Sequence, residues 1–380
     1  MAAAASPEQP RPVAGVDYPG NLVAFFDWFQ SEDDCWRYLV RLRWPDGFRC
    51  PACGHGEAWL TARRVFICTA CRKRVSALHG TLFARSQLSL LDWFRAAWLM
   101  ASQKRGVSAA STQTDLGLGS YKTAWALEHN LRRAMMHRDQ AKLTGEIEVD
   151  ETFVGGHRES DKSKGEEGKI KRGRGAPGKT FVAIAVEAPT HYRGLGRVRM
   201  RIIPDFHQET LEDFVTDTCA RGSVIYTDGS DSYNRLWELG YEHVVKVIRG
   251  SNLQGHDALP GVHRVASLLK RWLLGTHQGS VMRQHLDTYL EEFTFRFNRR
   301  RSRSRGLLFY TILKLALETP PLGYDTIVWS RRGARDPDAK LRGVEPRTPV
   351  PPDRRRPRAR RARELPRARR NGGAASQWEE

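Results

Sequence analysis

The sequence lacks any long hydrophobic run, because no apolar stretch reaches the roughly 18 residues that a membrane-spanning helix requires. Residues 1–16 are rich in alanine and proline and lack the apolar core of a secretory signal, so we expect this segment to be disordered. Cysteine is scarce, with 6 residues among 380. These absences argue against a membrane protein and against a secreted, disulfide-rich protein. We therefore expect a cytoplasmic protein.

Positive charge, in contrast, is abundant and spread along the chain. The formal net charge is +19, of which residues 331–380 contribute +9 and residues 1–330 contribute +10. A basic surface on a folded body attracts polyanions and releases their counterions. The composition therefore indicates a nucleic-acid partner; a charge that serves solubility, or codon bias toward arginine, is the alternative. The tail 331–380 is predicted to be disordered and to add non-specific phosphate affinity.

Four of the six cysteines form two Cys-x-x-Cys pairs, Cys50 with Cys53 and Cys68 with Cys71. Each pair places two thiolates on one turn, and two such turns complete a tetrahedral site for Zn²⁺. All four coordination positions would then be filled by the protein, so this zinc would be structural. We predict a zinc ribbon over residues 50–83. A redox dithiol is the alternative.

Helical patterns flank the ribbon. Residues 17–49 form an N-terminal helical segment, and residues 84–140 are predicted to be a helical DNA-binding segment. Within the second segment, one helix spans 90–102, and a further unit opens at residue 107, breaks at 116–120 and resumes through 121–135. This arrangement resembles a helix-turn-helix, in which Ser120, Lys122 and Thr123 would begin the DNA-facing helix. The alternative is an ordinary helical linker.

From residue 145 the hydrophobic period becomes that of strands. Strands are predicted at 146–150, 180–187, 197–203 and 223–228, and helices at 207–219, 262–274 and 286–297, with Gly275 ending the second helix. We therefore predict an α/β domain over residues 141–315, with a mixed sheet flanked by helices. The basic, glycine-rich loop 157–178 is interpreted as a DNA-contacting insertion or as a solvated surface loop.

Two aspartates lie at strand ends in this domain. Asp150 shares a strand face with Glu148, because residues two apart on a strand point to the same side. Asp228 ends the last predicted strand. Acids on adjacent strands can converge on hard divalent cations, and two such ions about 4 Å apart can activate a nucleophile and stabilise a leaving oxygen. Each acid alone could equally be a turn or cap residue, but their combination with the ribbon favours phosphoryl transfer.

The order of these features resembles that of the zinc-ribbon-headed, ISXO2-like DDE-type transposases of bacterial insertion sequences. The resemblance covers roughly residues 17–315. It implies a ribonuclease-H-like catalytic domain that cleaves the DNA ends of the element and joins them to target DNA. It also implies DNA as partner and at least a homodimer on DNA. The segments that carry it are Val149–Gly156, Tyr226–Gly229 with Tyr233, Ser267–Arg271 and Phe293–Arg300.

The family pattern consists of two aspartates and a third residue that a lysine follows seven positions later. By this resemblance Asp150 and Asp228 hold catalytic Mg²⁺ or Mn²⁺, His263 takes the third position, and Lys270 contacts the DNA backbone. Many relatives have Glu or Asn at the third position. A neutral imidazole prefers softer ions than Mg²⁺, so His263 is either a ligand that favours Mn²⁺ or a group acting on the nucleophilic water. Fallback ligands are His256, Asp257, Asp287, Glu291 and Glu292.

Further side chains have predicted roles outside the metal site. The candidates for DNA contact are Lys122, Lys270, Arg271, Arg299 and Arg300, together with Arg296. The aromatic residues of the helix 286–297 are predicted to pack against the sheet, and three tryptophans are predicted to pack in the core. These are Trp125, Trp237 and Trp272.

The function that the sequence indicates is therefore a nucleoid-associated insertion-sequence transposase with structural Zn²⁺ and catalytic Mg²⁺ or Mn²⁺, and without membrane contacts. Three alternatives stay open. The first is a non-catalytic zinc-ribbon DNA-binding protein or inactivated transposase. The second is a nuclease of the same fold that cuts without joining, and the third is an RNA-binding zinc-ribbon protein.

Overall fold

The computed structural model describes residues 11–136, 141–155, 179–188, 194–246, 258–279 and 281–329. The predictions for the loop 157–178, the tail 331–380, His256 and Asp257 therefore lie outside the described residues. Residues 11–16, expected to be disordered, make local hydrogen bonds, since the N–H of Val13 donates to the Asp17 carboxylate at 2.8 Å. In the described part of the chain, no helix has the length and apolar character needed to cross a membrane.

Ten helices and eight strands are described, besides the short 3₁₀ helices η2 (Asp231–Tyr233) and η3 (Arg283–His285). The helices are α1 (Leu22–Trp28), α2 (Glu32–Arg43), α3 (Leu90–Ser102), α4 (Ala109–Leu116), α5 (Tyr121–Met135), α6 (Gln208–Thr218), α8 (Pro260–His277), α9 (Leu286–Asn298), α10 (Arg305–Glu318) and α11 (Tyr324–Trp329). The strands are β1 (Ala58–Leu60), β2 (Val65–Cys68), β3 (Arg74–Ser76), β4 (Glu146–Val154), β5 (Thr180–Glu187), β6 (Val198–Ile203), β7 (Val224–Thr227) and β8 (Glu242–Val245).

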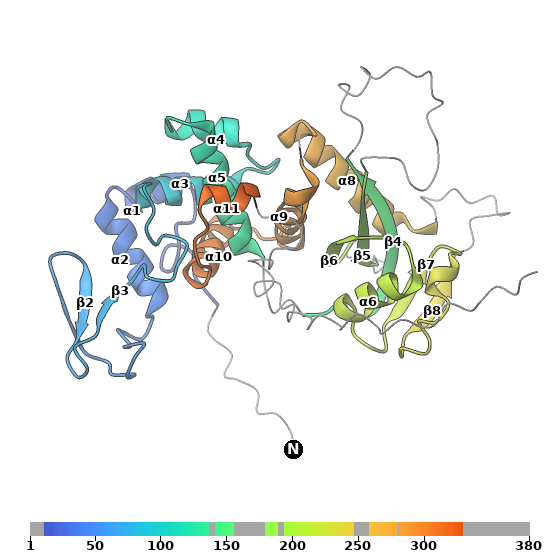
Figure 1. Cartoon of the computed structure of the whole chain (residues 1–380), viewed down its shortest axis with the longest axis horizontal. Coiled ribbons are helices and arrows are strands. Elements are labelled where there is room, and N and C mark those ends of the chain that lie inside the picture. Colours follow the sequence, from blue (N-terminus) through green and yellow to red (C-terminus); the bar gives the residue numbers. More distant parts are fainter. Residues whose placement is uncertain are drawn as a thin grey trace, which may run out of the picture. The chain divides into compact units, whose positions relative to one another are not determined.

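The N-terminal helices share a hydrophobic core with α10, a helix from the far end of the described chain. Phe309 of α10 is fully buried, and its ring centroid lies 5.5 Å from that of Phe25 in α1 and 5.7 Å from that of Phe94 in α3. Aromatic rings at these distances in edge-to-face geometry stabilise a core beyond the area they bury. The chain therefore returns to this helical core after the α/β domain (Figure 1).

The helices α3, α4 and α5 confirm the predicted helical pattern between residues 90 and 135. Ser108 and Ser120 cap α4 and α5 by accepting backbone N–H groups, and Gly117 closes α4 in the left-handed region with φ 64°. Most of α5 is buried, and only its first two residues, Tyr121 and Lys122, are exposed. Any DNA contact by α5 is therefore restricted to its first turn.

A five-stranded mixed sheet forms the α/β domain, with the strand order β6-β5-β4-β7-β8. The first three strands in the chain, β4 to β6, pair in antiparallel fashion, whereas β7 and β8 run parallel to β4. This order and these directions are those of the ribonuclease-H-like fold. The predicted fold class is therefore confirmed.

Alternating residues of the central strands face two different helical layers. Ile184 of β5 joins the hydrophobic cluster of α8 and α9, whereas its neighbour Ala185 joins the cluster of α6. On β4, Val149 faces the α6 side. Its neighbours Glu148 and Asp150 therefore face the side covered by α8. This alternation decides which residues of β4 can take part in a site with α8.

Several details differ from the predictions. β4 continues beyond the predicted end at residue 150 to Val154, and the helices α10 and α11 were not predicted. The helix α8 continues through Gly275 to His277 and ends at Gln278, whose φ of 51° is left-handed, because the helix packs against the sheet and so tolerates the glycine. The short edge strand β8 was not predicted. The core packing predicted for Trp237 is wrong, since this side chain is 67% exposed.

Candidate active site and zinc ribbon

The two predicted acids lie on neighbouring strands. β4 and β7 run parallel, and Glu148 is the Cα partner of Tyr226. Continuing this register by two residues places Asp150 beside Asp228, just beyond the last residue of β7. Asp150 lies in the middle of β4, which continues to Val154, and not at a strand end as predicted. Two residues that are far apart in the sequence are nevertheless brought side by side.

Backbone N–H groups orient both carboxylates. Oδ1 of Asp150 accepts a hydrogen bond from the N–H of Glu151 at 2.8 Å, and Oδ1 of Asp228 accepts one from the N–H of Ser230 at 3.1 Å. Each aspartate therefore has one oxygen engaged with the backbone. The Oδ2 atoms are the candidate ligand atoms for a cation.

α8 brings the other two predicted site residues toward Asp150. Nε2 of His263 lies 3.8 Å from Oδ2 of Asp150, with the two side chains 39% and 18% exposed. Lys270 follows His263 by about two helical turns, so both lie on the same side of α8. The ammonium group of Lys270 interacts electrostatically with Asp150, and burial is the main cause of its lowered pKa.

The pKa of Asp150 is raised to about 6, and the charges of the other three site residues contribute to this shift in opposite directions. Burial is the largest cause, since it disfavours the charged carboxylate, and the charge of Asp228 adds to the shift. The hydrogen bond from Glu151 and the charges of His263 and Lys270 oppose it. A divalent cation between the two carboxylates would relieve this unfavourable concentration of negative charge.

The donor set suits a hard or borderline divalent cation, since it consists of two carboxylates and one imidazole. Among the described residues, only the four cysteines of the ribbon form a group of three or more ligand side chains with all ligand atoms within 4.8 Å of one another. The ligand atoms of the acidic site are therefore more widely spaced than those of the cysteine site. Such spacing fits ions that keep water and phosphate oxygens as further ligands.

Hydrogen bonds on the opposite face of β4 support this part of the sheet. The hydroxyl of Tyr233, a fully buried residue of η2, donates to Oε1 of Glu151. On β7, Oγ1 of Thr227 lies 2.8 Å from Nε2 of His243 in β8. From the sequence, Tyr233 was noted only as part of a motif. Its contact with Glu151 could not be predicted, because the two residues are 82 positions apart and no local pattern links them.

The fallback ligand Glu292 has a structural role instead. It is fully buried on α9, where Oε2 lies 2.8 Å from Nε of Arg132 and Oε1 lies 3.2 Å from NH1 of Arg296. Burial alone would raise the pKa of Glu292, but the charges of Arg132 and Arg296 lower it. Asp287 and Glu291 lie on the same helix.

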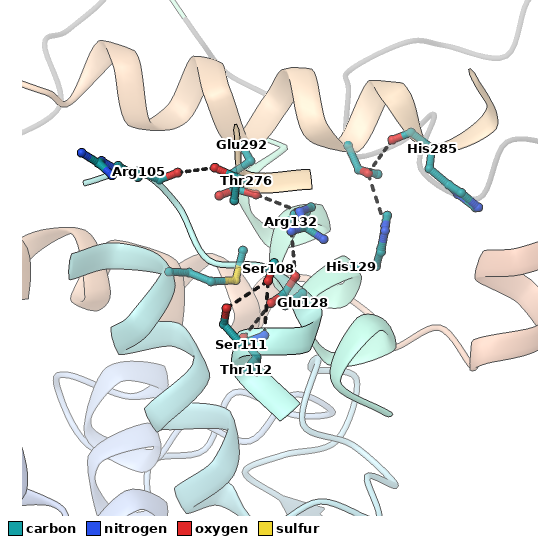
Figure 2. Close-up of polar contacts among 12 residues, drawn as sticks. Arg105, Ser108, Ser111, Thr112, Glu128, His129, Arg132, Thr276, His285 and Glu292 are labelled. Atoms are coloured by element: carbon teal, nitrogen blue, oxygen red, sulfur yellow. Dashed lines mark hydrogen bonds and ion pairs between the residues drawn. The ribbon is translucent and has the colours of Figure 1, made fainter. Parts of the chain in front are cut away.

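This ion pair belongs to a buried network that connects α4 and α5 with α9 (Figure 2). NH2 of Arg132 lies 2.8 Å from Oε2 of Glu128, and Thr112 of α4 donates to Oε1 of Glu128 at 2.6 Å. Burial raises the pKa of Glu128 despite Arg132, whereas Glu292 faces two cations. The helical segment and the α/β domain are therefore joined by charged groups without access to solvent.

The predicted DNA-contacting residues differ in their surroundings. Lys122 and Arg271 are exposed, at the start of α5 and on α8. Arg300, in contrast, donates to the backbone carbonyl of Gly196 at 3.1 Å, and Arg299 lies over an aromatic ring of its own helix at 4.0 Å. Arg296 also donates to a backbone carbonyl, that of Met100. The guanidinium groups of these three arginines, on α9 and at its end, are thus engaged in contacts within the fold.

The four cysteines converge as predicted. Sγ of Cys50 lies 3.6 Å from that of Cys71, and Sγ of Cys53 lies 3.6 Å from that of Cys68. All four sulfur atoms lie within 4.8 Å of one another. Tetrahedral Zn²⁺ with Zn–S bonds of about 2.3 Å requires sulfur–sulfur distances of about 3.8 Å. The residues present therefore fit a structural zinc ion.

The two Cys-x-x-Cys turns have the same backbone geometry but different residues at the position that adopts it. The N–H of Gly54 donates to the carbonyl of Cys50, and the N–H of Arg72 donates to the carbonyl of Cys68. Both donors have left-handed φ, 75° for Gly54 and 59° for Arg72. Glycine adopts this conformation without strain, whereas arginine does not. The guanidinium of Arg72 lies 4.5 Å from the ring of Trp59, whose side chain is 53% exposed.

Comparisons with known proteins agree with these features. The model of the ISXO2-like transposase domain matches residues 142–298, and the model of the transposase zinc-ribbon domain matches residues 30–74. An uncharacterised protein in the transposable element ISH50 of Halobacterium salinarum is 28% identical over 300 residues, which cover 76% of this chain and 98% of the relative.

A solved structure, the catalytic core domain of BIV integrase, is 15% identical and covers 43% of this chain and 90% of that chain. Its TM-score of 0.28 is too low to support an inference. The ribbon, the sheet topology and the two domain matches define a transposase of an insertion sequence. The chain carries a transposase zinc-ribbon domain followed by an ISXO2-like transposase domain.

Proposed function

We propose that this transposase is catalytically active and carries out metal-dependent cleavage of the ends of its element, followed by strand transfer. The observation that carries the proposal is the meeting of Asp150 and Asp228 on adjacent parallel strands, with Nε2 of His263 3.8 Å from Oδ2 of Asp150. In the first reaction, water adds to the phosphorus and the bond to the 3′ oxygen breaks. In the second, the released 3′-hydroxyl attacks a target phosphodiester and displaces a new 3′-hydroxyl.

The four site residues have distinct tasks in this proposal. Asp150 and Asp228 would hold Mg²⁺ or Mn²⁺ through their Oδ2 atoms, while the backbone holds their Oδ1 atoms. The bound ions would activate the nucleophile and stabilise the leaving oxygen. His263 completes the donor set and makes Mn²⁺ the better ion. Lys270 places a cation beside the site for the DNA backbone, and such positioning and charge neutralisation carry most of phosphoryl-transfer catalysis.

We also propose that the basic surface binds the DNA ends. The zinc ribbon, held by Zn²⁺, and the exposed cations Lys122 and Arg271 are the candidate contacts, and counterion release makes their binding salt-dependent. Joining two ends requires two copies of the site, so we propose at least a dimer on DNA, acting at the nucleoid in the cytoplasm. Light scattering of the complex with one and with two DNA ends tests this stoichiometry.

Cleavage of duplex DNA that carries the element's ends tests the activity. With Mn²⁺, the wild-type chain is expected to cut at the element boundary and to join the 3′ end to a circular target. Asp150→Asn is expected to remove both products while DNA binding stays intact. Asp231→Asn changes an exposed acid of η2 near Asp228 and is the matched control, expected to retain activity.

Each contrary result selects a named alternative. Binding without any cutting by the wild-type chain would leave a non-catalytic DNA-binding protein. Cutting without joining would leave a nuclease of the same fold. A preference for RNA, unaffected by Asp150→Asn, would leave an RNA-binding protein.

A further inference from the structure

Glu148 supplies the cap that α8 lacks. The first N–H groups of a helix have no partner within the helix and are usually accepted by a residue just before it. The residue before α8 is Leu259, which offers no side-chain acceptor. Instead, Oε2 of Glu148 on β4, 114 residues earlier in the chain, accepts the N–H of Val262 at 2.9 Å. A strand of the catalytic sheet thereby holds the start of the helix.

The contact is close because residue 261 has no side chain. A Cβ atom at Gly261 would lie 2.8 Å from Oε2 of Glu148 and 2.9 Å from Cδ2 of Leu195. Gly261 does not have a left-handed φ, so the backbone conformation does not require glycine there. The glycine is required by the close approach of α8 to the carboxylate.

This contact lies between the two halves of the candidate metal site. On the strand, Glu148 is two residues before Asp150 and points to the same face. On the helix, the N–H that Glu148 accepts belongs to the residue just before His263. The side chain of Glu148 is 5% exposed, and burial raises its pKa while the hydrogen bonds from Val262 and Gly261 oppose the shift.

We propose that Glu148 is a positioning residue of the metal site, which fixes the distance between Asp150 and His263 by anchoring the first turn of α8 on β4. The proposal rests on the proposed metal-dependent function of that site. The carboxylate acts through its hydrogen bonds to α8, so a neutral acceptor of the same shape can replace it.

Titration of the zinc-loaded protein, stripped of Mg²⁺ and Mn²⁺, with Mn²⁺ and without DNA tests the proposal directly. Glu148→Ala removes the acceptor, and we expect it to weaken Mn²⁺ binding by about 10-fold or more, the usual effect of losing a residue that orients a ligand. Glu148→Gln keeps an acceptor oxygen, so we expect a loss of less than about threefold. The matched control is Glu146→Gln, an exposed acid on the same strand, which is expected to bind Mn²⁺ like the wild type.

A double-mutant cycle with Gly261→Ala makes the test specific. The added Cβ meets the carboxylate, so Gly261→Ala alone is expected to weaken Mn²⁺ binding and to reduce amide exchange protection at the start of α8. In Glu148→Ala/Gly261→Ala the carboxylate is gone and only the contact of the added Cβ with Leu195 remains, so the double variant is expected to lose less affinity for Mn²⁺ than the sum of the two single losses. Such non-additivity is expected of residues in contact.

Two results would overturn the positioning role. In the first, Glu148→Ala and Glu148→Gln both bind Mn²⁺ like the wild type, even if their melting temperatures fall, and Glu148 is then only structural. In the second, both variants lose affinity equally, and the charge itself is then what the ion requires. A wild-type chain that binds Mn²⁺ but cuts no DNA would refute the proposed activity instead, while the binding cycle would still decide the role of Glu148.

Discussion

The buried ion network between α5 and α9 predicts a large loss of stability when its cation is removed. Arg132 is fully buried and lies 2.8 Å from both Glu128 and Glu292. Arg132→Met fills a similar volume but leaves the carboxylate of Glu128 without its cation and that of Glu292 with Arg296 alone. Removing one member of a buried ion pair costs about 3–5 kcal/mol, because the remaining charge is desolvated and uncompensated. We expect a loss of that size in the free energy of unfolding.

The assay is urea denaturation followed by tryptophan fluorescence, with an exposed ion pair as control. NH1 of Arg201 lies 2.7 Å from Oδ2 of Asp217, at a distance like those in the network, but the side chains are 37% and 66% exposed. Arg201→Met is expected to cost at most about 1 kcal/mol, because water screens the pair in both states. The two ion pairs thus have similar N···O distances and differ in their burial.

A compensated variant separates charge from packing. Adding Glu128→Gln and Glu292→Gln to Arg132→Met removes the three fully buried charges, and replacing a buried ion network is often neutral. Arg296 then loses Glu292 as its partner, but its side chain is 15% exposed and still donates to the carbonyl of Met100. We expect most of the lost stability to return. The reasoning is refuted if Arg132→Met costs no more than Arg201→Met, or if the triple variant is less stable than Arg132→Met alone.

Three further predictions follow from the ribbon and from α8. Arg72→Gly is expected to stabilise the ribbon by up to about 1 kcal/mol, because glycine adopts the left-handed backbone conformation without strain. The same variant is expected to weaken DNA binding and to reduce the slope of log affinity against log salt concentration by about 1. Unchanged affinity in a salt series would exclude Arg72 as a phosphate contact. Cys68→Ser is expected to release the zinc and melt the ribbon while the α/β domain keeps its exchange protection, as zinc analysis and hydrogen exchange would show. Burial lowers the pKa of His277 to about 4; the charge of Arg132 adds to this shift and that of Glu292 opposes it. Between pH 6.5 and 4, His277 therefore binds a proton in the unfolded chain but not in the folded chain. Stability is therefore expected to be fully present above pH 6.5 and to be lower by about 2 kcal/mol at pH 5, and His277→Phe should remove this part of the slope in urea titrations.

The parts of the fold that local sequence determines could be predicted. The helix over residues 90–102 begins at a serine that caps it, and β5 is a continuous run of strand-forming residues between segments without pattern. The two Cys-x-x-Cys turns specify their own geometry. The convergence of Asp150 and Asp228 could be proposed because both acids were expected on adjacent strands, whereas the parallel pairing of β4 with β7 and the extension of β4 to Val154 could not.

The parts that depend on distant contacts could not be predicted. Glu148 caps a helix 114 residues away, and Glu292, a candidate metal ligand by its sequence position, pairs with an arginine 160 residues earlier. Neither contact leaves a periodic signal, since each joins two residues that are more than 100 positions apart in the sequence. The exposed Trp237 shows the same limit, because large apolar residues are expected in the core unless the tertiary structure is known.

α8 is the element that connects these observations, because it is held at both ends by different parts of the fold. Its start is fixed on β4 by Glu148, and near its end Oγ1 of Thr276 donates to the carbonyl of Arg105 in the connection between α3 and α4 at 2.6 Å (Figure 2). That connection also passes Trp272 so closely that a Cβ at Gly106 would lie 2.6 Å from its Nε1. Because His263 and Lys270 lie between these two anchors, a displacement of the helical segment on DNA would be transmitted to the proposed metal site through α8.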